Sequence, residues 1–419
     1  MLWPVVGAGS FDGAHDAMHY LMRPIKARPQ KKGLKALDYG SPWNASAFPK
    51  VFLVLFVHKK NSSILLPMNS VRAKRHNYKA KIMKNTFASA KIIQLKTLCA
   101  EAKTIAVVSH TNPDGDAIGS GIALSTFLRG LGYEVRFFVP NHYPKFLDFL
   151  PGVERVEIYG EACETARNYM ADADLIICAD FNQVGRLDRM TDAIEANVIA
   201  PRVLIDHHLN PPEYELSFSD TEYCSTAHMV YDLICAWTGP EAITAEMAVA
   251  LYVGIVTDTG NLSYGNLTPE LYRAVAVLVE KGVRPIDVSR AVFNTQSESR
   301  LRMVGYLLSE KMKVDTERKT AYITLTRAEK TRFNHQIGDT EGIVNMPLSI
   351  DGIDFSAMFI ETLDCIKISF RSQGDFDVNL FAREHFNGGG HKNAAGGRFF
   401  GPMSEAVARF NEITQTLHP

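Results

Sequence analysis

The sequence predicts an α/β protein with a doubly wound, mostly parallel sheet, followed by a smaller α/β domain. From residue 90 to residue 281, short apolar segments rich in β-branched residues alternate with longer segments of helical spacing. This alternation is typical of parallel strands that are joined by helices and covered on both faces. Polar residues follow several of the short segments directly, and sheets of this kind bind ligands beyond the carboxyl ends of their strands. The fold class therefore also indicates where a site should lie.

The predicted elements follow in chain order. A first amphipathic helix is indicated by the spacing of Ile92, Ile93, Leu95 and Leu98. Buried strands are predicted at 104–109, 135–139, 175–179 and 203–205. Helices are predicted at 117–131, 227–237, 245–256 and 269–281. Further along the chain, alternating residues predict strands at 319–326 and 366–370.

Four segments are expected: a head at 1–83, a main domain at 84–290, a linker at 291–312 and a second domain at 313–419. The head has 14 Lys+Arg and 3 Asp+Glu, hence +11, and the whole chain carries −1, so the remainder carries −12. The head lacks a sustained period and is expected to be disordered. It is interpreted as a basic arm for nucleic acid, a targeting segment, or a stretch upstream of a working start at Met83. We favour the last interpretation, because a compact domain begins directly after Met83.

Composition excludes several classes of protein. No apolar run reaches the roughly 18–20 residues that span a bilayer, so no membrane protein is predicted. The 6 cysteines are scattered without a C-x-x-C pair, which favours a reducing compartment such as the cytoplasm. The acidic body argues against strong, sequence-independent binding of long nucleic acids.

Acidic and histidine side chains gather after the predicted strands and at the end of one helix. They are His110, Asp114, Asp116, Asp180, Asp206, His207, His208 and Asp258. Each segment also has an ordinary interpretation: Asp114-Gly115-Asp116 as a turn, Asp180 as a helix cap, and Asp206-His207-His208 as a cap with packed rings. Four such segments at corresponding strand or helix ends favour a joint metal site instead.

Several carboxylates at one sheet edge repel each other, and their charged forms require a counter-charge. Two divalent cations supply it, and carboxylates with imidazole suit Mn2+, Mg2+ or Zn2+. Two ions about 3.5–4 Å apart can activate a hydroxide and stabilise the leaving oxygen of a phosphoester. The prediction is therefore two-metal phosphoester hydrolysis. In addition, Gly119-Ser120-Gly121 at the start of the next helix is expected to offer backbone N–H groups to an anion.

A second group of candidate residues lies in the second domain. Arg371 follows a predicted strand, and a guanidinium fork suits two phosphate oxygens. Gly388-Gly389-Gly390-His391 comes later, and glycines let a backbone approach a ligand closely. A bare glycine run is more often a flexible surface loop. The arginine before it and the run Ala394-Ala395-Gly396-Gly397 after it favour a substrate-binding site.

Five motifs together carry a resemblance to a known family. They are VVSHTNPDGDAIGS, ICADFNQVGRLD, LIDHHLNP, YVGIVTDTG and FNGGGHKNAAGG, in this order over about residues 104–398. With them the chain resembles the DHH phosphoesterase superfamily with its DHH-associated C-terminal domain. It is similar in particular to the bacterial bifunctional oligoribonucleases and 3'-phosphoadenosine-5'-phosphate phosphatases, often called nanoRNases. Phe181 departs from the Ser or Thr of many relatives, which puts a local hydroxyl contact in doubt.

The resemblance implies a role for each candidate residue. One ion would be held by His110, Asp114 and Asp180, and a second by Asp116, Asp180, His207 and Asp258. His208 would face the scissile phosphate, and Asp206 would orient the histidines. The substrate would be contacted by Arg371, Gly388, Gly389, Gly390 and His391. Two Mn2+ are expected per chain, with Mg2+ or Co2+ as substitutes.

The resemblance further implies hydrolysis of very short oligoribonucleotides, including dinucleotides, to mononucleotides in the cytoplasm. Conversion of 3'-phosphoadenosine-5'-phosphate to AMP would be a second activity. Short RNAs and nucleotide bisphosphates are thus the expected partners, and a homodimer stays open. Three alternatives stay open: a RecJ-type single-strand DNA exonuclease, a manganese pyrophosphatase and a non-catalytic nucleotide-binding sensor. The first usually carries an additional oligonucleotide-binding domain, and the second lacks the GGGH motif.

Overall fold

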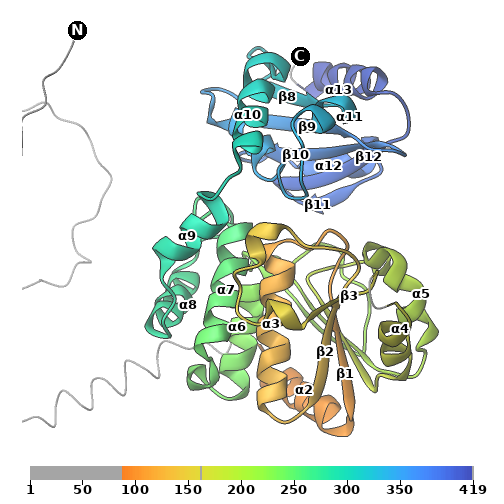
Figure 1. Ribbon diagram of the computed structural model, residues 1–419, viewed down its shortest axis with the longest axis vertical. Coiled ribbons are helices and arrows are strands. Elements are labelled where there is room, and N and C mark those ends of the chain that lie inside the picture. The colour runs from red at the N-terminus through yellow and green to blue at the C-terminus, as the bar shows by residue number, and fades with distance from the viewer. Residues whose placement is uncertain (1–86, 161–162, 418–419) are drawn as a thin grey trace, which may run out of the picture. The chain divides into compact units, whose positions relative to one another are not determined.

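The computed structural model describes residues 87–160 and 163–417 (Figure 1). The basic head predicted at 1–83 lies outside the described residues. Two six-stranded sheets organise the described chain. No helix in the described ranges is both long enough and apolar enough to cross a membrane.

The first sheet is entirely parallel and has the strand order β3-β2-β1-β4-β5-β6. Its strands are β1 (Thr104–Val108), β2 (Glu134–Val139), β3 (Val156–Ile158), β4 (Leu175–Ala179), β5 (Arg202–Asp206) and β6 (Leu216–Ser219). All six carboxyl ends therefore leave the sheet at one edge. The order reverses between β1 and β4, and such a reversal is where doubly wound sheets bind ligands. The predicted fold class is confirmed, and the two strands that the sequence did not predict, β3 and β6, form the edges.

Helices cover both faces of this sheet (Figure 1). One core contains Ile105 and Val107 of β1 and the helices α2 (Ser89–Glu101), α3 (Gly115–Gly130), α6 (Thr226–Trp237), α7 (Ala245–Asp258), α8 (Pro269–Glu280) and α9 (Pro285–Phe293). The opposite core contains Ala106 and Val108 with α4 (Cys163–Asp172) and α5 (Thr191–Ala196). Short 3-10 helices complete this part: η1 (Lys145–Leu147), η2 (Val153–Arg155), η3 (Val184–Met190) and η4 (Pro240–Ala242). Alternate residues of β1 thus face opposite layers, as a doubly wound sheet requires.

The second sheet is mixed and has the order β11-β12-β10-β9-β8-β7. Its strands are β7 (Lys313–Asp315), β8 (Thr320–Leu325), β9 (Phe355–Glu361), β10 (Ile366–Ser372), β11 (Gly389–His391) and β12 (Ala394–Phe399). Its helices are α10 (Glu298–Tyr306), the π-helix η5 (Leu307–Lys311), α11 (Arg327–Arg332), the 3-10 helix η6 (Ile343–Ser349), α12 (Val378–His385) and α13 (Met403–Leu417). Only β8 and β9 pair in parallel. The predicted smaller α/β domain is confirmed, and much of the predicted linker at 291–312 is helical.

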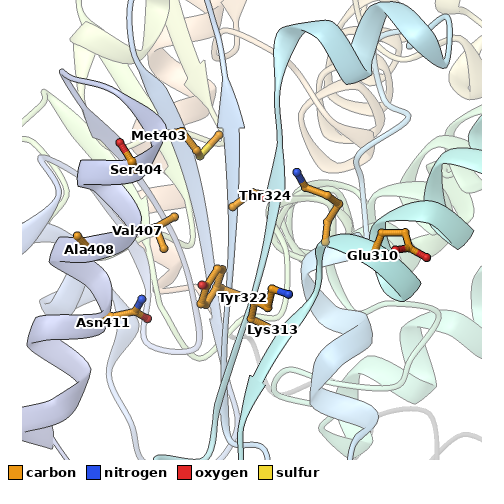
Figure 2. Close-up of a pocket in the computed structure, with 10 residues that line it drawn as sticks. Glu310, Lys313, Tyr322, Thr324, Met403, Ser404, Val407, Ala408 and Asn411 are labelled. Atoms are coloured by element: carbon orange, nitrogen blue, oxygen red, sulfur yellow. The ribbon is translucent and has the colours of Figure 1, made fainter.

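A pocket of about 480 Å³ lies on this second sheet next to α13 (Figure 2). Tyr322 and Thr324 of β8 line it from the sheet, and Met403 and Val407 line it from α13. None of the candidate residues predicted from the sequence lines this pocket, so the candidate site lies elsewhere.

Candidate active site

The candidate residues of the first domain lie at the carboxyl ends of the central parallel strands. His110 comes after β1, and Asp180 comes directly after β4. Asp206 is the last residue of β5, and His207 and His208 follow it. β1 and β4 are the neighbours between which the strand order reverses. Asp258, the last residue of α7, joins them, because its Oδ2 lies 3.2 Å from Nε2 of His207. The parallel sheet thus brings together residues that are up to 148 positions apart in the chain.

The loop between β1 and α3 is fixed at both ends by side-chain hydrogen bonds. Oδ1 of Asp114 accepts the backbone N–H groups of Asp116 at 3.0 Å and Ala117 at 3.1 Å, which caps α3. Oδ1 of Asn141 accepts the N–H of Asn112 at 2.7 Å. The cap occupies one carboxylate oxygen of Asp114 and leaves the other for a further partner.

The glycines of α3 serve helix packing. The helix begins at Gly115, so Gly119-Ser120-Gly121 lies inside it, where backbone N–H groups are bonded within the helix. A Cβ atom on Gly119 would collide with the carbonyl oxygen of Ala250 in α7, and one on Gly121 with the ring of Phe137. The prediction that this segment offers N–H groups to an anion is therefore wrong. Its glycines allow α3 to approach α7 and β2 closely.

Asp116 is fully buried beside the first turn of α6. Its Oδ2 accepts the N–H of Thr226 at 2.6 Å, and its Oδ1 accepts the N–H of Ala227 at 2.8 Å. Burial, together with the charges of Asp180 and Asp258, raises the pKa of Asp116 well above its usual value. A neighbouring cation would favour the charged form of this carboxylate.

Asp180 lies at the centre of the cluster. Its Oδ1 accepts the hydroxyl of Thr226 at 3.0 Å, and its Oδ2 lies 3.5 Å from Nε2 of His110. Burial raises the pKa of Asp180, but the hydrogen bond and charge of His110 and the charge of His207 outweigh burial and lower it. The residue also has a φ of 67°, a conformation that costs a non-glycine residue about 1–3 kcal/mol. Such strain is typical of residues held in place for function.

His207 presents its Nε2 atom to three carboxylates. Nδ1 lies 3.2 Å from the carbonyl oxygen of Tyr223, so this carbonyl orients the ring. Asp206 was predicted to orient both histidines, but it contacts the ring of His208 and not that of His207. Nε2 is buried and makes no hydrogen bond with a described residue. Burial lowers the pKa of His207, but Asp258, Asp116 and Asp180 outweigh burial and raise it to about 10. A ring bonded at Nδ1 with Nε2 facing carboxylates is the arrangement of a metal ligand.

His208 lies between a carboxylate and a guanidinium. Its Nδ1 is 2.7 Å from Oδ1 of Asp206, and its Nε2 is 3.3 Å from Nη1 of Arg186. Because arginine only donates, Nε2 accepts and the hydrogen of the ring sits on Nδ1. Burial and the charges of His391, His207 and Arg186 lower the pKa of His208 well below its usual value. Burial also raises the pKa of Asp206 to about 7. The ring is therefore neutral, with its orientation fixed from both sides.

Two predicted residues of the second domain lie near this cluster. The ring of His391 stacks on that of His208, with centroids 4.3 Å apart and planes 26° apart. Burial and the charge of His207 lower the pKa of His391 to about 3. Burial lowers the pKa of Arg371, which lies at the end of β10, and the charges of Tyr264 and Asp258 partly oppose this lowering. The structure thus places His391 against the strand-end cluster and Arg371 in the electrostatic reach of Asp258.

The glycine run before His391 forms part of a strand instead of a flexible loop. Gly389–His391 is β11, which pairs with β12 in the antiparallel sense. A Cβ atom on Gly388 would collide with the carbonyl oxygen of Gly396, and one on Gly390 with that of Ala394. Close strand pairing therefore requires these two glycines, and the pairing fixes the position of His391.

Three side chains of the cluster were not predicted from the sequence. Arg186 acts on the pKa values of five candidate residues, namely His110, Asp180, Asp206, His208 and His391. Thr226 binds Asp180, and Tyr264 lies near Arg371. Arg186 falls within the motif ICADFNQVGRLD, which was a usable signal. Thr226 and Tyr264 lie in segments whose sequence shows no comparable signal.

The side chains fit a centre for divalent cations. Four sets of three have ligand atoms within 4.8 Å of one another. They are His110/Asp114/Asp180, Asp116/Asp180/His207, Asp180/Asp206/His208 and His207/His208/His391. Asp180 belongs to three of the four. Carboxylate oxygens and imidazole nitrogens are the ligand atoms that suit such ions, and the buried Nε2 of His207 facing three carboxylates is one more observation of fit.

Comparison with known proteins places the chain in a family. The DHH family N-terminal domain matches residues 104–255, and the DHHA1 domain matches residues 322–417. The bifunctional oligoribonuclease and PAP phosphatase NrnA of Thermus thermophilus is 30% identical over 317 residues, 74% of this chain and 89% of that protein. Its namesake in Bacillus subtilis is 28% identical over 304 residues, 71% of this chain and 90% of that protein. A crystal structure of an exopolyphosphatase-related protein from Bacteroides fragilis is 41% identical, covers 80% of this chain and 99% of its own, and superposes with a TM-score of 0.76. This chain therefore belongs to the DHH family of phosphoesterases.

Proposed function

We propose that this chain is a two-metal phosphodiesterase that hydrolyses very short oligoribonucleotides, including dinucleotides, to mononucleotides. Conversion of 3'-phosphoadenosine-5'-phosphate to AMP is a second proposed activity. The observation that carries the proposal is the contact between His208 and His391, at 4.3 Å between ring centroids. It joins the carboxylate and histidine cluster to a residue of the second domain, which suits a small substrate. The two activities stated in the names of the Thermus and Bacillus relatives support the same substrates.

Two Mn2+ ions are the proposed cofactors, with Mg2+ or Co2+ as substitutes. The first set of ligands is His110, Asp114 and Asp180, and the second is Asp116, Asp180, His207 and Asp258. Asp180 fits a bridging role, because its two oxygens face different sides: Oδ2 faces His110 at 3.5 Å and Oδ1 faces His207 at 3.7 Å. When bound, two such ions activate a hydroxide and stabilise the leaving oxygen of a phosphoester.

His208 and Arg186 are proposed to face the phosphate that is cleaved. Asp206 holds the Nδ1–H of His208, so Nε2 points away from Asp206 and toward Arg186. A phosphate that binds here receives the donors of the Arg186 guanidinium. The same negative charge favours a proton on Nε2 of His208, which then donates to a phosphate oxygen.

The second domain is proposed to hold the nucleotide. Arg371 offers a fork of N–H donors to a phosphate that is not cleaved, and His391 offers a neutral ring to a phosphate or base. The pairing of β11 with β12 fixes His391, and Gly388 and Gly390 allow the close approach to β12. We assign residues 84–290 to catalysis and residues 313–419 to substrate binding on this basis.

A reducing location such as the cytoplasm is part of the proposal. Five cysteines are free, namely Cys99, Cys178, Cys224, Cys235 and Cys365. Four of them are buried, so their thiols act as small core groups. Free thiols are the usual state in compartments kept reducing by glutathione and thioredoxin.

One panel of substrates tests the proposal. The purified chain with Mn2+ is given a 5'-labelled dinucleotide, a 5-mer, a 24-mer, 3'-phosphoadenosine-5'-phosphate and pyrophosphate, and kcat/KM is compared. The dinucleotide should have a kcat/KM about 100-fold or more above that of the 24-mer. This is the scale of discrimination expected when the disfavoured substrate loses a few contacts in the site. Preference for the 24-mer would indicate a processive exonuclease, and preference for pyrophosphate a pyrophosphatase. Tight binding without turnover of any compound would indicate a nucleotide sensor.

A further inference from the structure

A groove of about 590 Å³ lies beside the loop that carries His110. It is lined by residues that follow β1, residues that follow β2, part of η3, and Arg398 of β12. Its volume falls within the roughly 300–1,000 Å³ that small-molecule sites occupy. The groove can therefore accommodate a ligand the size of one nucleotide.

The groove adjoins the residues proposed to face the cleaved phosphate. Thr111 lines it and is the neighbour of His110, and the N–H of Thr111 donates to the carbonyl oxygen of Arg186 at 2.7 Å. Gly185 lines it and precedes Arg186, whose guanidinium contacts His208. A ligand bound here would thus lie next to the phosphate position.

Two arginine side chains give the groove a positive character. Arg189 and Arg398 both line it, both are exposed, and neither forms an ion pair with a carboxylate in the described ranges. Arg136, by contrast, pairs with Glu157. Asp188 is the acidic residue of the lining, so the two positive charges of the arginines outweigh its one negative charge. Guanidinium groups without a protein partner suit the phosphate oxygens of a nucleotide.

The wall of the groove is held in an unusual backbone conformation. Asn112 has a φ of 52° and Asp188 a φ of 48°, which non-glycine residues rarely adopt. Asn141 fixes the wall, because its Oδ1 accepts the hydroxyl of Thr111 at 3.0 Å and the N–H of Asn112 at 2.7 Å. Residues strained in this way cluster at ligand sites, and a wall held rigid lowers the cost of ordering on binding.

We propose that this groove binds the nucleotide on one side of the cleaved phosphodiester, while the nucleotide on the other side is held by Arg371 and His391. The inference rests on the proposed function and names how a dinucleotide occupies the site. A dinucleotide fills both places. A nucleoside 3',5'-bisphosphate has one nucleoside and fills only the place at Arg371. One metal centre then serves both classes of substrate.

The kinetic test is the double variant Arg189→Ala with Arg398→Ala, assayed with Mn2+. For the dinucleotide pApA, kcat/KM should fall about tenfold or more, mainly through KM, because two charged hydrogen-bond donors are lost. For 3'-phosphoadenosine-5'-phosphate it should stay within about twofold, since that compound does not enter the groove. Arg398→Glu should weaken the dinucleotide further by repulsion. Arg273→Ala is the matched control, because Arg273 is an exposed arginine that pairs with Glu270 on α8 and lines no part of the groove.

A binding test separates the groove from catalysis. Calorimetry with Mn2+ and a pApA analogue, whose internal phosphodiester has a methylene group in place of the bridging oxygen, should give tighter binding of the analogue than of AMP. The double variant should lose this difference. Equal losses on both substrates, or an unchanged affinity of the double variant for the analogue, would overturn the inference. If the unaltered chain hydrolyses neither compound, the proposed function fails, and the calorimetric comparison still decides whether the groove binds a second nucleotide.

Discussion

The Nδ1 atom of His208 lies 2.7 Å from Oδ1 of Asp206, a fully buried carboxylate at the end of β5. The other oxygen of Asp206 is buried and makes no hydrogen bond with a described residue. Asp206 therefore orients His208 alone, while the carbonyl of Tyr223 orients His207. The two adjacent histidines thus differ in their second partners, which is a physical basis for giving them different roles: His207 as metal ligand and His208 as phosphate partner.

Replacing Asp206 by Asn is expected to lower kcat on the dinucleotide by about 100- to 10,000-fold, the scale seen when a histidine loses its orienting carboxylate. An amide can donate to Nδ1, so the ring can adopt the wrong tautomer. Bound Mn2+, measured by mass spectrometry, should be unchanged. Asp354→Asn, at a half-exposed carboxylate near Lys319, is the control. A kcat equal to that of the control would remove the orienting role.

Replacing Arg186 by Ala is expected to lower kcat about 10- to 100-fold, because a donor to the developing phosphate charge is lost. Arg186 also lowers the pKa values of His208 and His391. Both pKa values should therefore rise in Arg186→Ala, which NMR titration of the ring protons in the metal-free protein can measure. Arg186→Lys keeps the charge and should leave the pKa values closer to the original. Unmoved histidine titrations would show that the guanidinium does not act on these rings.

Replacing Arg371 by Ala is expected to raise KM for the dinucleotide about 10- to 100-fold and to change kcat less, because a charged contact to a spectator phosphate is lost. Arg371→Lys should be intermediate, since it keeps the charge but lacks the planar fork. The measurement is steady-state kinetics on the dinucleotide with and without a terminal 5'-phosphate. Identical kinetics of Arg371→Ala and the unaltered chain would exclude Arg371 from the substrate contacts.

Replacing Glu329 by Gln is expected to destabilise the second domain by about 1–2 kcal/mol near pH 7, through loss of the charge in its hydrogen bonds. A glutamine can still close the capping box with Thr326, so the substitution tests the charge alone. Burial raises the pKa of Glu329, but Lys311, Thr326 and Tyr306 outweigh burial and lower it from 4.5 to about 2. Its folded-state pKa is thus below the unfolded value. The contribution is therefore complete above pH 4.5 and is lost as the pH falls toward 2.

Urea unfolding at several pH values measures this contribution. The difference in unfolding free energy between Glu329→Gln and the unaltered chain should shrink between pH 4.5 and 2. A difference that stays constant over this range would contradict the charged role of Glu329. Glu298→Gln is the control, because its pair with Arg302 is exposed on α10.

The parallel sheet and its cluster of acidic and histidine side chains could be predicted because both leave strong local signals. Strands buried on both faces, such as Leu175–Ala179, are continuous apolar runs, and the acidic residues follow them directly. The edge strands β3 and β6 left no such run, since Val156–Ile158 has three half-buried residues and Leu216–Ser219 alternates. In the second domain, β11 consists of two glycines and a histidine, which have no strand preference and pair only because β12 is present.

The long-range partners of the site could not be predicted in the same way. Asp116 binds the first turn of α6, and Thr226 of that turn binds Asp180. These contacts depend on how α3, α6 and α7 pack together, which no local pattern specifies. The role of Arg186 likewise depends on the path of η3, where Asp188 has an unusual backbone conformation. Residue type and spacing therefore indicated the candidate metal-binding side chains, whereas the groups that position them could be identified only from the structure.

The most direct test of the account measures bound Mn2+ and dinucleotide hydrolysis in one titration. The unaltered chain should bind about two Mn2+, and hydrolysis should require both, as in two-metal phosphoesterases. Asp180→Asn, at the proposed bridging ligand, should lose bound metal and nearly all hydrolysis while keeping its circular dichroism spectrum. Two tightly bound Mn2+ in Asp180→Asn together with near-normal hydrolysis would contradict the two-metal centre at these residues.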